Sequence, residues 1–135
     1  MTQEEILEGN KLIAEFMGAK PCKNYWREDA LEHEDWEHDE WTNTTREYFV
    51  TKIHKVSELK YHSSWDWLMP VVEKIEMDCK CDVHIYAHYN WKEPNRCAIY
   101  DWKDKEIASK SNDSKIIAVW LAVVEFIKWH NNETR

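Results

Sequence analysis

The amino-acid sequence predicts one α+β domain, built from a small antiparallel sheet with two to three packed helices and an acidic, Trp-containing insert. Three observations lead to this fold class. The chain has 135 residues, which is close to the usual size of one domain. Segments of helical periodicity stand on both sides of alternating, strand-like segments. Two glycines and three prolines leave little material for long linkers. We therefore predict a single domain over residues 1–135, with an N-terminal helix (1–18), an acidic segment and strand (21–60) and a helix–sheet–helix core (61–131).

The first element is a helix over residues 3–17. Ile6, Ile13 and Phe16 fall on one side of it at helical spacing. Gly18 follows directly and is a common residue at a helix end.

A strand is predicted over residues 48–56, and a second helix follows it. The strand alternates loosely between apolar and polar residues. Ser63 or Ser64 can cap the second helix. Pro70 indicates either a kink or a helix that begins near this proline. The apolar stripe of this helix consists of Trp67, Leu68, Val71, Val72 and Ile75.

Strict alternation makes residues 82–91 the clearest strand. Its two faces consist of Val83, Ile85, Ala87, Tyr89 and Trp91 on one side and His84, Tyr86, His88 and Asn90 on the other. A turn at 92–95 leads into a strand at 96–102, and a short third strand is predicted at 106–109. Two helices on one face of this antiparallel sheet would bury both apolar stripes.

The last helix begins after Asn112, Asp113 or Ser114 as its cap and runs to about residue 131. It is apolar on more than half of its circumference. Such a helix either lies at the centre of the core or exposes part of its face to a partner, and the second arrangement makes a homodimer plausible.

Residues 27–47 differ in character from the rest of the chain. Eight acidic residues lie from Glu28 to Glu40 with no lysine or arginine among them. Carboxylates on a folded surface can imitate nucleic-acid phosphates and occupy the basic groove of a nuclease or an RNA-guided effector. Tryptophan is enriched among the residues that dominate binding energy. The alternative is a surface loop kept soluble by its charge. The predicted partner-binding residues are Glu34, Asp35, Trp36, Glu37, Asp39, Glu40 and Trp41.

The net charge of −8 argues against direct nucleic-acid binding, which needs clustered lysine and arginine. It also argues against docking on anionic membranes, and it favours a partner protein with a basic surface.

No apolar run approaches the length of a membrane span. The N-terminus is polar and does not resemble a signal peptide, so we expect the cytosol. The four cysteines, Cys22, Cys79, Cys81 and Cys97, are expected to be reduced thiols.

The sequence also contains residues that suit nucleotide binding, metal binding or catalysis. His84, Tyr86 and His88 share a strand face and have the side chains of a nucleotide pocket. His33 and His38, with Glu34, could hold a divalent metal, and Cys79, Cys81 and Cys97 with a histidine could hold zinc. A solvated charge run and structural thiols are the simpler interpretations. We expect no cofactor and no metal. No nucleophile elbow and no glycine-rich phosphate loop is present, so we do not expect an enzyme.

Three blocks of sequence resemble a group of small uncharacterised proteins from phages and prophages of Bacteroidetes. They are residues 10–18 (NKLIAEFMG), 61–76 (YHSSWDWLMPVVEKIE) and 124–131 (VEFIKWHN). The resemblance implies a phage accessory protein that acts in the cytoplasm of the bacterial host. Such proteins often bind and inhibit a host defence component, as anti-CRISPR proteins do. We therefore predict a non-enzymatic anti-defence inhibitor. The alternatives are a binding protein that sequesters a nucleotide signal and a metal-dependent hydrolase.

Overall fold

The computed structural model describes residues 1–21, 30–38, 47–87 and 94–133. In the strands near the N-terminal half, the side chains of residues 21, 30, 32–38 and 47–53 are not described. The elements in chain order are α1 (Gln3–Phe16), β1 (Lys20–Pro21), β2 (Ala30–His38), β3 (Glu47–Lys55), the short 3-10 helix η1 (Val56–Glu58), α2 (Trp65–Asp78), β4 (Asp82–Tyr86), β5 (Asn95–Tyr100), β6 (Glu106–Asn112) and α3 (Lys115–Glu133).

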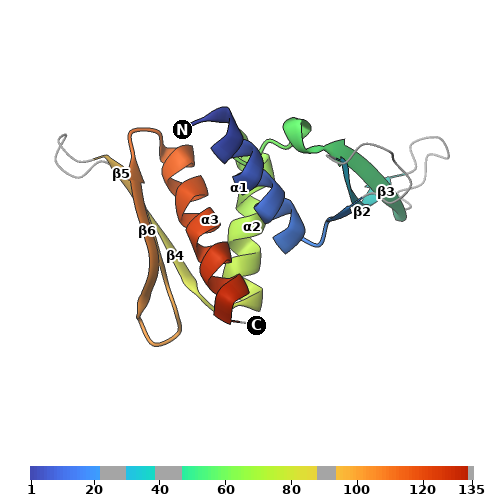
Figure 1. Ribbon diagram of the computed structural model, residues 1–135. Helices are drawn as coiled ribbons and strands as arrows, with labels where there is room; N and C mark the ends of the chain where they lie inside the picture. Colours follow the sequence, from blue (N-terminus) through green and yellow to red (C-terminus); the bar gives the residue numbers. More distant parts are fainter. Residues whose placement is uncertain (22–29, 39–46, 88–93, 134–135) are drawn as a thin grey trace.

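The fold is α+β, as predicted, but its strands form two antiparallel sheets instead of one. One sheet has the order β1-β2-β3 and the other β4-β5-β6. The helices lie between them (Figure 1). The strand predicted at 48–56 exists as β3, and it pairs with β2 and not with the strands of the C-terminal half. None of the described helices combines the length and the apolar character that a membrane span requires.

The helix α3 is the centre of the core. Val119, Val123, Phe126 and Ile127 have no exposed surface, and Trp120 is 2% exposed. The helix packs against α1, α2, β5 and β6. Most of its wide apolar circumference is therefore covered by the chain itself, although Trp129 is 36% exposed. The homodimer stays a prediction.

Packing of α1 on α3 depends on a glycine. A Cβ atom on Gly9 would overlap the indole ring of Trp120, so the close approach of the two helices requires a residue without a side chain. At the start of α1 the Thr2 hydroxyl accepts from the Glu5 amide at 3.1 Å. The predicted stop signal at the other end is confirmed, because Gly18 adopts a φ of +98°.

A buried polar junction joins three parts of the core. The Asn10 amide nitrogen donates to the Leu59 carbonyl at 3.2 Å and lies 2.9 Å from Nδ1 of His62. Its carbonyl oxygen accepts from the Trp120 indole at 2.9 Å. The indole N–H can only donate, which fixes the orientation of the Asn10 side chain. Asn10 is 1% exposed, and these bonds satisfy it.

The helix α2 begins at Trp65, directly after Ser64, and continues through Pro70. A helix that starts near Pro70, one of the two predicted alternatives, is therefore wrong. The predicted stripe is confirmed, because Leu68, Val71, Val72 and Ile75 are the buried residues of α2.

The sheet β4-β5-β6 is covered on one face by helices (Figure 1). Val83 and Ile85 pack partly buried against the core, next to the fully buried Cys97 and Ile99. The predicted alternation in β4 is thus confirmed as far as Tyr86. The strand ends there, five residues earlier than predicted, and residues 88–93 lie outside the described part of the chain.

Candidate functional site

The acidic segment forms part of an arm, which we define as β1, β2 and β3. Strand β2 pairs with β3 over nine residues, from Ala30 opposite Lys55 to His38 opposite Glu47. Strand β1 pairs along the other edge of β2. The sequence predicted an insert here and no strand, because charged residues are uncommon in strands and no apolar alternation marks this one.

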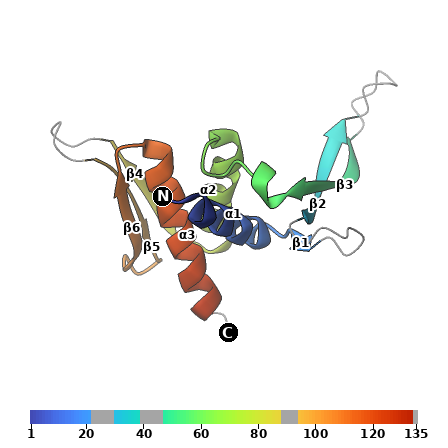
Figure 2. The same ribbon diagram turned by 45° about the horizontal axis from the view of Figure 1, so that its top comes forward.

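The arm is attached to the helices at its base. Leu31 is 3% exposed and packs with Ala14, Val56 and Leu59. The ring of His54 lies 5.5 Å from the ring of Trp67 on α2. The arm extends from the side of the helices opposite to β4-β5-β6 (Figure 2). It therefore projects from the body while its base is held by a small hydrophobic cluster.

Strand geometry divides the predicted partner-binding residues between two faces. Successive residues of a strand alternate between faces, so Glu34 and Trp36 share one face of β2 and Asp35 and Glu37 share the other. The remaining predicted residues, Asp39, Glu40 and Trp41, lie outside the described residues. A flat partner surface could contact only one set. A partner that contacts both must enclose the arm.

The charge along β2 is dense. Between positions 32 and 37 the strand carries four carboxylate residues and no lysine or arginine. At about 3.4 Å per residue this is one carboxylate per roughly 5 Å, while one DNA strand has one phosphate per about 3.4 Å of helix axis. The carboxylates of β2 are thus somewhat more widely spaced than the phosphates of a DNA strand, and the neighbouring strands of the arm carry three lysines, Lys20, Lys52 and Lys55.

The strand conformation removes the spacing on which the metal interpretation of the arm rested. His33 and His38 are five positions apart in β2 and so lie on opposite faces. Glu34 and His38 share a face but are about 13 Å apart along the strand, instead of one turn apart on a helix. Among the residues with described side chains, no group of three histidine, cysteine or acidic residues could hold a metal ion.

The C-terminal cysteines do not converge either. Cys79 caps the end of α2, and the Cys81 thiol lies 3.5 Å from the Cys79 carbonyl. Cys97 pairs in register with Ile85 and Lys110, well along the sheet from both. Cys79, Cys81 and Cys97 are free thiols. Burial raises the pKa of the Cys97 thiol to about 12, so this thiol is a core residue and not a nucleophile.

The second candidate surface is the side of β4-β5-β6 that faces away from the helices, which we call the sheet face. The rings of His84 and Tyr86 lie 6.1 Å apart and only 14° from parallel. Tyr100, on the next strand, meets the His84 ring edge-on at 5.4 Å. Tyr86 is 43% exposed. His84 is exposed as well, and the described helices lie on the opposite side of this sheet (Figure 1).

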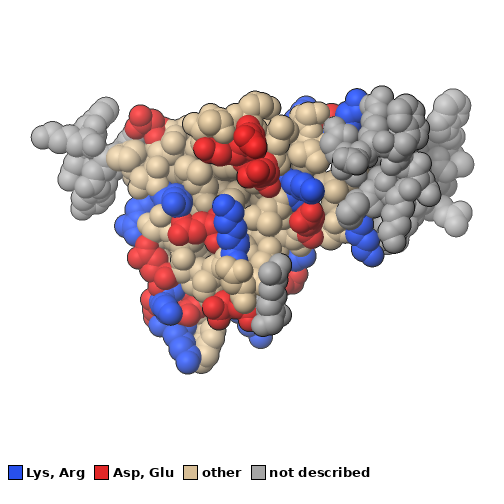
Figure 3. All heavy atoms as spheres, in the orientation of Figure 1, with Lys and Arg blue, Asp and Glu red and all other residues tan. Residues whose placement is uncertain are grey.

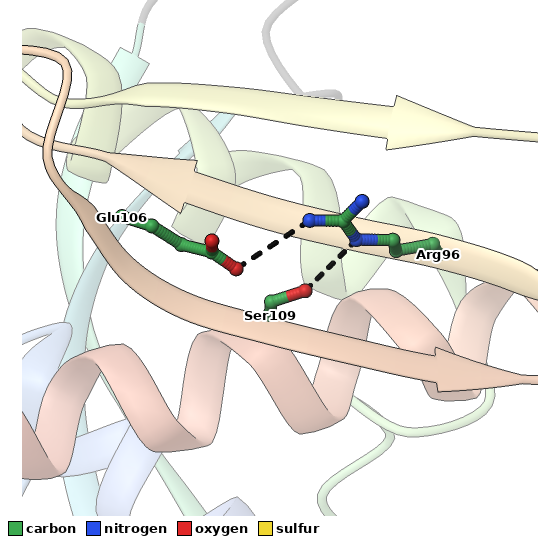
Figure 4. A network of polar contacts seen from close by, with 3 residues as sticks. All are labelled: Arg96, Glu106 and Ser109. Carbon is green, nitrogen blue, oxygen red and sulfur yellow. Dashed lines mark hydrogen bonds and ion pairs between the residues drawn. The ribbon is translucent and has the colours of Figure 1, made fainter.

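Arg96 connects the rings to the third strand. Its guanidinium carbon lies 5.7 Å from the centre of the Tyr86 ring. Its Nε donates to the Ser109 hydroxyl at 2.9 Å, and its Nη2 lies 3.4 Å from a Glu106 carboxylate oxygen. Figure 4 shows the guanidinium between these two residues of β6, with its third nitrogen directed away from both. The arginine is thus held in place over the sheet.

The small residue Ala98 explains how these side chains gather. It pairs with His84 on one side and Ser109 on the other, and it has no exposed surface. Its methyl group is therefore covered by neighbouring parts of the chain. The pKa of Tyr100 is raised, first by desolvation and then by the charge and hydrogen bond of Tyr86. The face is therefore a connected polar and aromatic cluster.

Of the predicted ligand-binding residues, the structure brings His84 and Tyr86 together, and His88 lies outside the described residues. Sequence reasoning missed Arg96, Tyr100 and Glu106. The alternation of the strand at 96–102 places Arg96 and Tyr100 on one face, but it does not give the register with β4, which brings them to the rings.

Charges over the remainder of the visible surface are mixed. Lysine and arginine are interspersed with acidic residues over the helices and the C-terminal sheet (Figure 3). Lys110 on β6, for example, pairs with Glu125 of α3 at 3.5 Å. This view offers no basic surface that a nucleic acid could follow.

Comparisons with protein-family models, curated proteins and solved structures found no match for this chain. The similarity of three sequence blocks to the phage group therefore remains a prediction.

Proposed function

We propose that this protein is a non-enzymatic phage accessory protein that binds a host defence protein and inhibits it through the acidic arm. The observation that carries the proposal is the conformation of the acidic segment. It is a nine-residue strand paired along its whole length and anchored at its base by the buried Leu31. A paired strand presents its carboxylates in a fixed order, which a surface loop does not.

The shape of the arm favours a groove as the binding surface. Acidic residues lie on both faces of β2, so a groove that encloses the strand pair neutralises more charge than a flat surface. A two-stranded ribbon is narrow enough to enter the major groove of DNA, so a protein groove wide enough to hold a nucleic-acid duplex also admits the ribbon. The proposed partner surface is the basic nucleic-acid groove of a defence nuclease or RNA-guided effector.

Pre-organisation and an aromatic anchor favour affinity. A segment that is already ordered loses little conformational entropy on binding. Trp36 stands near the distal end of the ribbon and pairs in register with Phe49. Tryptophan is among the residues that most often dominate interface energy, so Trp36 is the proposed anchor among the carboxylates.

The test is an affinity pull-down from host lysate with matched charge variants. The arm variant carries Glu34→Gln, Asp35→Asn, Glu37→Gln, Asp39→Asn and Glu40→Gln. The control variant neutralises five exposed helix carboxylates, by Glu8→Gln, Glu15→Gln, Glu73→Gln, Glu76→Gln and Glu133→Gln. Both variants change the net charge by the same amount.

The proposal predicts that the wild type and the control variant retain the same defence protein and that the arm variant loses it. Inhibition of the defence activity by the purified protein must follow the same order. Equal retention by all three proteins would show that the arm is not the binding surface. Loss in both variants would show that only net charge matters, and it would equally contradict the proposal.

A further inference from the structure

The sheet face has the chemistry of a second site, which does not depend on the arm. Its cluster joins three strands through two exposed or partly exposed rings in β4, Arg96 in β5 and two hydrogen-bonding residues in β6. The opposite face of the same sheet already serves the core. The stability of the sheet does not require aromatic rings and a guanidinium on this face, because the solvent-facing side of an antiparallel sheet commonly carries ordinary polar residues.

We propose that the sheet face binds a mononucleotide, with the base stacked on Tyr86 and His84 and the phosphate on Arg96. Flat rings are the surfaces on which bases stack irrespective of sequence. A guanidinium recognises phosphate through parallel N–H donors. Both groups lie within one cluster, because the guanidinium carbon of Arg96 is 5.7 Å from the Tyr86 ring centre.

The arginine is positioned but not saturated. Ser109 accepts from Nε at 2.9 Å and thereby fixes the orientation of the guanidinium plane. Glu106 contacts only Nη2, at 3.4 Å, with about half of each side chain exposed. An exposed pair of this length contributes little stability. A phosphate can therefore replace the Glu106 carboxylate, and Nη1 has no partner in the described part of the chain.

Size and charge favour a single nucleotide over a polymer. Three strands about 4.8 Å apart span about 10 Å, which suits one base with its phosphate. The whole chain carries a net charge of −8, which repels a long polyanion. One phosphate can contact the Arg96 guanidinium and meets much less of that repulsion than a polymer does.

The test is a nuclear magnetic resonance titration of the full chain with four probes: adenosine monophosphate, adenosine, inorganic phosphate and single-stranded oligoadenylate. We expect adenosine monophosphate to shift the amides of β4, β5 and β6 and to bind at least about tenfold more tightly than adenosine or phosphate, since only it uses both contacts. Shifts confined to other elements, no binding, or affinity that rises with oligoadenylate length would each overturn the proposal.

Single substitutions test the stacking contact of Tyr86 and the phosphate contact of Arg96 separately from the effect of a change in net charge. Tyr86→Ala and Arg96→Gln should each weaken binding about tenfold or more, while Tyr86→Phe keeps the ring and should retain it. Lys128→Gln removes an exposed positive charge from α3, away from the sheet face, and should leave binding unchanged. Equal losses in Lys128→Gln and Arg96→Gln would overturn the role of Arg96. The arm variant should bind the nucleotide normally, so failure of this site and failure of the arm are distinguished.

Discussion

At the scale of single residues, the core depends on two neighbouring positions in α1. Gly9 lets Trp120 approach the helix backbone, and Asn10 receives the indole N–H of the same tryptophan. The first is a requirement of space and the second a requirement of hydrogen bonding. Each therefore gives a separate prediction for the free energy of unfolding.

Replacing Gly9 by alanine should destabilise the protein. Alanine normally favours a helix over glycine by about 1 kcal/mol, but here its Cβ overlaps the Trp120 ring. Overpacking of this kind costs about 1–3 kcal/mol. Urea unfolding of Gly9→Ala beside Lys11→Ala, an exposed position of the same helix, measures the effect. An alanine at position 9 that stabilises the protein would contradict the described packing.

Replacing Asn10 by alanine should destabilise the protein by about 2–3 kcal/mol, because it leaves the Trp120 indole and the Leu59 carbonyl buried without their partner. Substitution of Thr2, whose hydroxyl caps the exposed start of α1, should cost only about 1 kcal/mol. The two variants are compared by denaturant unfolding. Equal effects would show that the buried junction is not important for stability.

The burial of Cys97 predicts that the free energy of unfolding depends on pH. Its pKa is about 12 in the folded protein, above the ordinary 9.0, because burial disfavours the thiolate. The unfolded chain releases this proton first as the pH rises, so the stability contributed by the neutral thiol is complete below about 9 and is lost toward about 12. Between about pH 8 and about pH 10.5, Cys97→Val should lose less stability than the wild type. An identical loss in both would contradict the buried position.

At the scale of elements, the two sheets differ in how they are supported. Strand β5 is central, with Cys97, Ala98 and Ile99 fully buried. The arm is a ribbon whose described contacts with the helices lie at its base, around Leu31 and His54. A ribbon of two strands is only marginally stable without such support.

Hydrogen exchange should therefore separate the two sheets. We expect the amides of β5 to exchange at rates near those of global unfolding, and the amides of β2 and β3 to exchange faster through local opening. Leu31→Ala should accelerate exchange in the arm more than in β5, since it removes the anchor. Equal protection of both sheets in the wild type would show that the arm is an integral part of the core.

The elements that the sequence predicted are those in which local pattern and burial agree. All three helices carry apolar residues at helical spacing, β4 alternates, β3 alternates loosely, and β5 is a short apolar run. Strand β2 carries charge on both faces, so it is defined by its pairing with β3 and not by its own pattern. The division into two sheets and the register that brings Arg96 to Tyr86 depend on long-range pairing, which local patterns do not specify. The sequence therefore predicted His84 and Tyr86, which lie on one strand, and missed Arg96, which reaches them only through strand pairing.

At the scale of the whole molecule, the helices separate two surfaces of different chemistry. The arm with its acidic strand β2 lies on one side of the helices, and the sheet β4-β5-β6 lies on the other (Figure 2). The sheet face carries the rings and the arginine. The two proposals predict different responses to salt. Binding of a basic partner by the arm should weaken strongly when ionic strength rises from about 0.1 to about 0.5 M, because exposed charges are screened. Nucleotide stacking on the sheet face should weaken less. A partner affinity that does not change with salt would contradict binding through the arm.

The most direct test of the proposed function is competition between this protein and a DNA or guide RNA for the captured defence protein. If the arm occupies the nucleic-acid groove, the two ligands exclude one another, the wild type displaces the nucleic acid, and the arm variant does not. A stable ternary complex, with the nucleic acid still bound beside the wild-type protein, would contradict the account.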